Sequence, residues 1–141
     1  MILNDEYYMQ LAITEAKEAL LKDEIPIVAV IVANDRIIAK THNLTEHLND
    51  VTAHAEMQAI TAAADALGGK YLKNCTLYVT IEPCQMCAGA LYWSQISKIV
   101  VGARDNKRGF ETMVGQLHPK TELIYGGLEQ ESKNLKLNFL E

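Results

Sequence analysis

The sequence predicts an α/β protein with a mixed five-stranded sheet flanked by helices. Segments whose apolar residues recur at helical spacing alternate with short β-branched segments, and strands separated by helices need crossover connections. The first two expected strands are joined by a tight turn, so this pair should be antiparallel and the sheet mixed. Given 141 residues, 49% of them hydrophobic and 22% charged, we expect one domain over residues 1–141 with helices on both faces of the sheet.

Local patterns at the start of the chain predict a helix followed by a hairpin. Apolar residues at helical spacing favour a helix over residues 5–22, and Asn4 can cap its start. Residues 25–32 are almost all apolar and largely β-branched, which is typical of a strand buried on both faces. Asn34 and Asp35 then turn the chain into a partner strand over residues 36–42.

The middle of the chain predicts two further strand and helix segments. Thr52 is expected to cap a second helix, which Gly68 and Gly69 end after Leu67. Alternating residues over 76–81 predict a strand, and Pro83 lies where a third helix would begin. The remaining elements are expected as a strand over 99–102, a long loop over 103–121, a short strand over 122–125 and a helix over 128–139.

Charge and composition argue against several classes of protein. With 13 Lys and Arg against 18 Asp and Glu, the net charge is −5, which disfavours a broad surface for polyanions. The N-terminal sequence lacks the basic and apolar regions of a secretory signal, and no stretch approaches the ~18 apolar residues that cross a bilayer. We therefore expect a cytoplasmic protein without a membrane role. Its odd number of cysteines, three, favours metal binding or catalysis over a disulfide framework, and Cys75, which lies away from the other two, is expected to be structural.

The residues suited to chemistry lie at the starts of the second and third expected helices. His54 and Glu56 open one, and Cys84 and Cys87 open the other. Helices that follow strands begin at the carboxyl ends of those strands, where open α/β sheets bind ligands, so these side chains should meet in one crevice. One imidazole and two thiolates suit Zn²⁺, and a three-ligand site leaves a position for water, as catalytic zinc sites do. Glu56 is then the natural proton carrier.

Each motif alone has another interpretation. Cys-x-x-Cys also fits a redox dithiol, and His-x-Glu by itself says almost nothing. Their combination, with each motif opening a helix after a strand, favours a zinc site, and it resembles the signature of the zinc deaminases. Residues i and i+2 lie about 200° apart on an ideal helix, so His54 and Glu56 can share a site only in an irregular leading turn.

With these motifs the chain resembles the bacterial tRNA-specific adenosine deaminases, a branch of the zinc-dependent cytidine/deoxycytidylate deaminase superfamily. The segments Met86-Cys87-Ala88-Gly89-Ala90 and Gly102-Ala103-Arg104-Asp105 are typical of the tRNA branch. The resemblance implies the three-layer α/β/α cytidine deaminase-like fold, and one Zn²⁺ per subunit held by His54, Cys84 and Cys87. It further implies hydrolytic deamination of the wobble adenosine, position 34, of tRNA to inosine, with Glu56 moving the protons and ammonia released.

The resemblance also implies a homodimer that binds the anticodon stem-loop of tRNA(Arg). It assigns Asn43 to orienting the base and Ile25, Pro26, Leu44 and Ala55 to the pocket. Val28 stands where the family usually has glycine beside the base.

The segment after the fourth strand is locally basic and lies beside the expected crevice. Because single-stranded RNA is bound through phosphate contacts and base stacking, we expect this segment to contact RNA, with Phe110 as a stacking surface. Asp105 within it matches an acid that lies close to the nucleotide in the family. The candidate contacts are Arg104, Asp105, Lys107 and Arg108.

Two other functions remain open at this point. A deaminase of a free nucleobase or nucleoside, of the guanine or cytosine type, would use the same zinc chemistry without the basic segment. A zinc-stabilised binding module without catalysis is the second.

Overall fold

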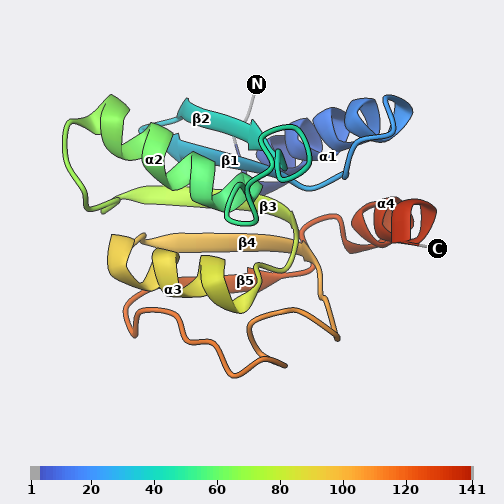
Figure 1. Cartoon of the computed structure of the whole chain (residues 1–141). Helices are drawn as coiled ribbons and strands as arrows, with labels where there is room; N and C mark the ends of the chain where they lie inside the picture. The colour runs from blue at the N-terminus through green and yellow to red at the C-terminus, as the bar shows by residue number, and fades with distance from the viewer. Residues whose placement is uncertain (1–3, 141) are drawn as a thin grey trace.

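The computed structural model describes residues 4–140, which form four helices and five strands (Figure 1). Their order along the chain is the expected one: it begins and ends with a helix, and two pairs of consecutive strands and one single strand lie between the helices. No helix within residues 4–140 is both long and apolar enough to span a membrane. The elements are α1 (Asp5–Leu21), β1 (Val28–Ala33), β2 (Arg36–His42), α2 (Ala55–Leu67), β3 (Cys75–Ile81), α3 (Gln85–Ser94), β4 (Lys98–Ala103), β5 (Glu122–Tyr125) and α4 (Glu129–Leu140).

The five strands form one mixed sheet in the order β2-β1-β3-β4-β5. The hairpin strand β1 is antiparallel to both β2 and β3, whereas β3, β4 and β5 are mutually parallel. Since β2 and β3 are each antiparallel to β1, they point the same way. The carboxyl ends of β2, β3 and β4 therefore meet at one edge of the sheet, together with the start of β1.

Helices cover both faces of the sheet, which confirms the expected α/β fold with three layers. In Figure 1, α2 and α3 lie in front of the sheet, and α1 and α4 lie on the other side. The alternation of side chains along the strands separates two cores accordingly. Ile31 and Val79 pack with Ala59 of α2 and Leu91 of α3, whereas Val30 packs with α1.

The structure corrects the expected start of α2. The N-cap is His54 rather than Thr52, and its backbone is extended, with φ −70° and ψ 155°. Thr52 instead donates its hydroxyl to the Asp50 carboxylate at 2.7 Å, closing a turn before the helix. Gly68 does end the helix in the left-handed conformation, with φ 71°, as its sequence position predicts.

Candidate metal centre and substrate cavity

The candidate ligands are placed by the first turns of two neighbouring helices. His54 is the N-cap of α2, Cys84 is the N-cap of α3, and Cys87 lies one turn into α3. Neither N-cap side chain caps its own helix by a hydrogen bond, so both are available to other partners. Because α2 follows β2 and α3 follows β3, and only β1 separates these strands, residues thirty positions apart come together.

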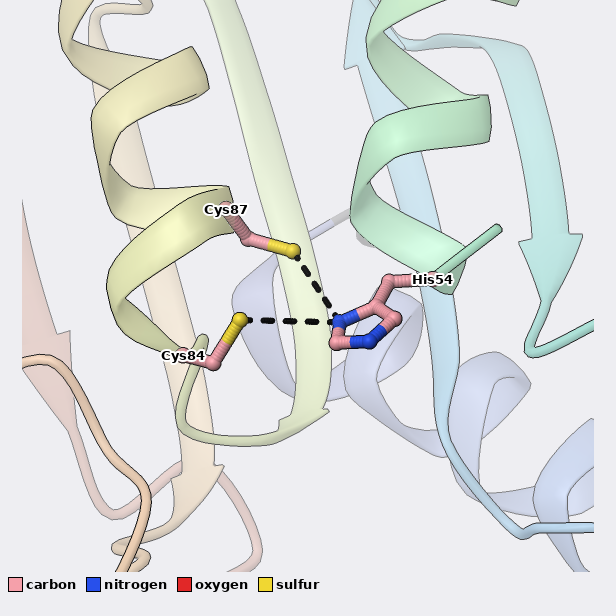
Figure 2. Close-up of side chains that lie close together, drawn as sticks. All are labelled: His54, Cys84 and Cys87. Carbon is pink, nitrogen blue, oxygen red and sulfur yellow. Dashed lines mark hydrogen bonds between the residues drawn. The ribbon is translucent and has the colours of Figure 1, made fainter. Parts of the chain in front are cut away.

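The three side chains converge on one point, as Figure 2 shows. Nδ1 of His54 lies 3.5 Å from Sγ of Cys84 and 3.5 Å from Sγ of Cys87. All three donor atoms lie within 4.8 Å of one another. For tetrahedral zinc with Zn–S of about 2.3 Å and Zn–N of about 2.0–2.1 Å, the expected N to S separation is about 3.5 Å. The donor types and their spacing thus fit zinc.

The electrostatics of the two thiols favour a ligand role. A hydrogen bond with the Cys87 thiol lowers the pKa of Cys84 to about 5, against the opposing effect of burial. The same hydrogen bond and burial raise the pKa of Cys87. Both thiols also lie at the positive end of the α3 dipole, which favours thiolate. One thiolate is therefore available at neutral pH, and a bound cation would favour the second.

Glu56 lies beside this group in the first turn of α2. His54 lies before the helix and has an extended backbone, so the angle that separates residues i and i+2 on an ideal helix does not apply to it. The side chains of His54 and Glu56 therefore both reach the same cavity. The Glu56 side chain is buried, and burial raises the pKa of its carboxyl to about 7. A carboxyl with this pKa can both accept and release a proton near neutral pH.

A cavity of about 310 Å³ opens onto these groups at the carboxyl edge of the sheet. Its size is that of a small-molecule site. Besides His54, Glu56 and Cys84, its walls include five of the expected substrate-binding residues: Ile25, Pro26, Asn43, Asp105 and Arg108. Leu44 lines an adjoining groove instead. Among the described residues, Ala55, Arg104 and Lys107 are not part of the cavity wall.

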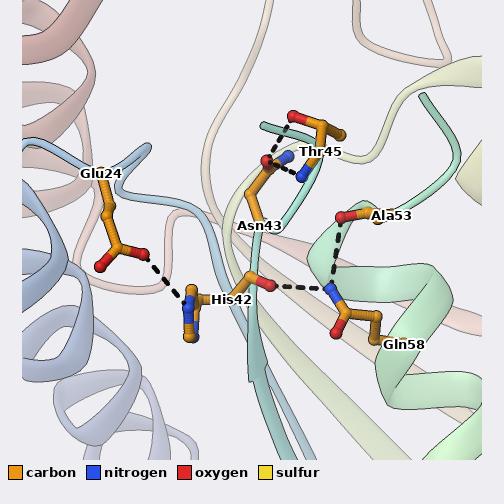
Figure 3. Close-up of polar contacts among 6 residues, drawn as sticks. All are labelled: Glu24, His42, Asn43, Thr45, Ala53 and Gln58. Atoms are coloured by element: carbon orange, nitrogen blue, oxygen red, sulfur yellow. Dashed lines mark hydrogen bonds and ion pairs between the residues drawn. The ribbon is translucent and has the colours of Figure 1, made fainter. Parts of the chain in front are cut away.

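Asn43 is both a turn residue and part of the cavity wall. Its Oδ1 accepts the backbone N–H of Thr45 at 3.0 Å and the Thr45 hydroxyl at 2.8 Å (Figure 3). The backbone N–H can only donate, so this side-chain atom must be the oxygen. The amide nitrogen has no partner among residues 4–140. Asn43 therefore offers the cavity a hydrogen-bond donor of fixed orientation.

The neighbouring His42 is turned away from this cavity, as its alternation along β2 predicts. Its imidazole pairs with the Glu24 carboxylate at 3.3 Å (Figure 3). Val28 packs in the core under α1 and is likewise not part of the cavity wall formed by the described residues.

The basic segment after β4 is only partly as expected. The Arg104 guanidinium stacks on the Tyr125 ring, 3.6 Å from its centre, and pairs with Glu111 at 2.8 Å. Lys107 and Arg108 are exposed. The expectation for Phe110 is wrong, because its side chain is only 5% exposed and anchors the segment to the protein instead of offering a stacking surface.

The chain belongs to the cytidine and deoxycytidylate deaminases, because the model of their zinc-binding region matches residues 3–103. Within this family, it is similar to the tRNA-specific adenosine deaminase of Bacillus subtilis. The two are 48% identical over 133 residues, which cover 90% of this chain and 83% of that protein. These findings confirm the family resemblance.

Solved structures agree with this assignment. A structure from work on A-to-I editing by tRNA:A34 deaminases superimposes with a TM-score of 0.83 and 42% identity, covering 92% of this chain and 98% of that one. Guanine deaminase from Bacillus subtilis is also similar, with a TM-score of 0.68 and 41% identity over 72% of this chain and 65% of that one.

Four residues of the cavity wall were not expected from the sequence, the apolar Ile27 and Ile81 and the polar Thr45 and Glu82. Thr45 holds Asn43, and the buried Glu82 lies between β3 and Cys84. Thr45 lies in a polar loop, where its sequence position does not distinguish it from any other turn residue. Nothing local to Glu82 indicates its partners, which lie more than twenty positions along the chain.

Proposed function

We propose that this protein is a zinc-dependent hydrolase that deaminates the wobble adenosine, position 34, of tRNA to inosine and releases ammonia. The observation that carries the proposal is the convergence of His54, Cys84 and Cys87 with Glu56 on one cavity. The similarity to tRNA-specific adenosine deaminases supports tRNA as the substrate. His54, Cys84 and Cys87 would hold one zinc ion per subunit.

Glu56 would carry the protons of the reaction. Zinc, when bound, supplies Lewis acidity that lowers the pKa of a water ligand toward ~7. Hydrolysis joins a water oxygen to C6 of adenine and breaks the bond from C6 to the exocyclic nitrogen. The two protons of that water must reach the ring and the departing amine. The buried Glu56 carboxyl, whose pKa is about 7, can take up and deliver them in turn.

Asn43 would orient the base. With its oxygen held by Thr45, its amide can only donate toward the cavity, which suits the acceptor nitrogens of a purine ring. Ile25 and Pro26 supply apolar walls for the ring faces. A base splayed out of an anticodon loop enters such a pocket by unstacking from its neighbours.

The charges around the cavity mouth would bind the RNA backbone. Arg108 is exposed at the cavity wall and Lys107 is exposed next to it. We retain Arg104 as a contact, because its half-exposed guanidinium can bind phosphate from its place on Tyr125. A stem-loop of few nucleotides needs only a few such cations, so the net charge of −5 is compatible with RNA as the substrate.

We further propose that residues 1–141 form a single domain around one sheet, and that the protein acts as a homodimer in the cytoplasm. Exposed apolar side chains next to α2 and on α3, Val51 at 84% and Trp93 at 75% exposure, would be covered in such a dimer. The molar mass in solution, measured by light scattering, tests this.

The test of the substrate is direct. Purified protein is incubated with an anticodon stem-loop of tRNA(Arg), with a matched stem-loop carrying guanosine at position 34, and with free guanine, cytosine and cytidine. We expect inosine from the first substrate only. Turnover of a free base or nucleoside without inosine in the stem-loop would contradict the proposal and favour the second candidate. The likeness to guanine deaminase is the observation that makes this candidate specific.

A further inference from the structure

The segment of residues 104–111 shapes one wall of the cavity although it contains no helix or regular strand. It is joined to the segment that leads into α3. The N–H of Phe110 donates to the carbonyl of Pro83 at 2.9 Å, and the N–H of Glu82 donates to the carbonyl of Ala103 at 2.8 Å. Cys84 and Gly109 form an isolated antiparallel bridge between the two segments. The cavity wall and the ligand-bearing helix start are thus one hydrogen-bonded unit.

The Glu82 carboxylate binds the 104–111 segment near both of its ends. Its side chain is buried, with 6% exposed. Oε1 accepts the N–H of Asp105 at 3.0 Å, and Oε2 accepts the N–H of Glu111 at 3.2 Å. A carboxylate has two acceptor oxygens and no donor, so it matches two backbone N–H groups that converge from opposite ends of a loop.

Asp105 in turn accepts hydrogen bonds from the residues that follow it in the loop. Its Oδ1 accepts the N–H groups of Lys107 and Arg108, both at 3.0 Å. Its carbonyl accepts the N–H of Gly109 at 2.9 Å. Fixing the backbone of Asp105 therefore fixes the turn that carries Lys107 and Arg108.

Gly109 is required by the same arrangement. A Cβ at this position would overlap the Glu82 carboxylate and come within 2.5 Å of the carbonyl oxygen of Asp105. Loop and carboxylate are packed too closely for any side chain, so an added methyl would push the loop off Glu82.

We propose that Glu82 is a positioning residue: its carboxylate holds the 104–111 segment so that Asp105 and Arg108 face the cavity, and it thereby sets the affinity for RNA. The proposal rests on the proposed function, and it assigns Glu82 no contact with the reacting atoms. The loop acts on binding and not on the bond-breaking groups, so its loss should appear in KM and leave kcat almost unchanged.

Glu82→Gln is the first test. The amide keeps one acceptor oxygen but turns an NH₂ toward a backbone N–H, so one of the two hydrogen bonds is lost. For a hydrogen bond to a charged group, we expect KM for the anticodon stem-loop to rise about tenfold, with kcat within about twofold and zinc content unchanged. Glu122→Gln, on the exposed start of β5, is the matched control and should change neither constant.

Gly109→Ala is a second way to displace the loop from the Glu82 carboxylate. Alone, it should raise KM as Glu82→Gln does. In a Glu82→Ala background the loop is already released from the carboxylate, and only the Asp105 carbonyl oxygen remains close to the new methyl. Adding Gly109→Ala to that background should therefore raise KM by a smaller factor than it does in the unchanged protein. Such non-additivity is expected only if the two positions act on one contact.

A readout without RNA separates this proposal from the proposed function. Trypsin cleavage after Lys107 and Arg108, followed by mass spectrometry on the native protein, should be several-fold faster for Glu82→Gln than for the unchanged protein and for Glu122→Gln. Equal cleavage rates would overturn the proposal, and so would loss of zinc with lowered kcat and unchanged KM. Absence of inosine with the unchanged protein would contradict the proposed function alone, because the cleavage rates would still decide the role of Glu82.

Discussion

The hydroxyl of Thr45 should contribute measurably to catalysis because it helps to fix Asn43. Asn43 Oδ1 is held by two hydrogen bonds from Thr45, one from the backbone N–H and one from the hydroxyl. Thr45→Val keeps the shape and the N–H but removes the hydroxyl. A neutral hydrogen bond contributes about 0.5–1.5 kcal/mol, so we expect kcat/KM to fall by about two- to tenfold as the amide gains freedom to rotate.

The assay is steady-state formation of inosine in the anticodon stem-loop, with zinc content and melting temperature measured on the same samples. Thr45→Ser is the control, because it retains the hydroxyl and should keep kcat/KM close to that of the unchanged protein. Asn43→Ala, which removes the donor itself, should be more damaging than Thr45→Val. If Thr45→Val has full activity while Asn43→Ala does not, the reasoning about the fixed amide is refuted.

Three further changes test the site and the fold. Cys87→Ser should reduce zinc content and, because metal binding is coupled to folding, lower the melting temperature; unchanged metal analysis would contradict the ligand assignment. For Asp5, burial raises the pKa, but hydrogen bonds from Lys98 and Tyr78 outweigh it, so the pKa lies below the ordinary 3.8. The stabilisation from its carboxylate is present above pH ~4 and is lost as the pH falls through the lowered pKa. Asp5→Asn should therefore cost about 1 kcal/mol or less at pH 7, and the difference in unfolding free energy should vanish in acid. The Ser132 hydroxyl is fully buried and has no hydrogen-bond partner among residues 4–140, so Ser132→Ala should stabilise the protein by about 1 kcal/mol in urea titrations; a loss of stability would show that this hydroxyl is satisfied.

The arrangement of the sheet could be predicted because its signals are local. The alternation of side chains in β3 and the run of apolar residues in β1 indicate which faces of the sheet are covered by helices. The hairpin turn at Asn34 and Asp35, both with positive φ, then sets the antiparallel pair. Helices that follow β2 and β3 must begin at the same edge, which is why the convergence of His54 with the cysteines was predictable.

Features that depend on contacts between distant segments could not be predicted. On an ideal helix, the side chains of His54 and Glu56 would point in different directions and could not share a site. They do share one because His54 precedes the helix and has an extended backbone. Phe110 was expected to be exposed in a polar segment, but it anchors that segment in the interior. Glu82 gives no signal, because its two partners are backbone N–H groups, which every sequence offers alike.

The central claim is that Glu56 moves protons at a zinc site that His54, Cys84 and Cys87 form. Its most direct test measures zinc content and inosine formation on total tRNA, in parallel, for the unchanged protein and for Glu56→Ala. We expect about one zinc per chain in both samples, with inosine at the wobble position from the unchanged protein only. Inosine formed at an undiminished rate by Glu56→Ala, or an active protein that contains no metal, would contradict the account.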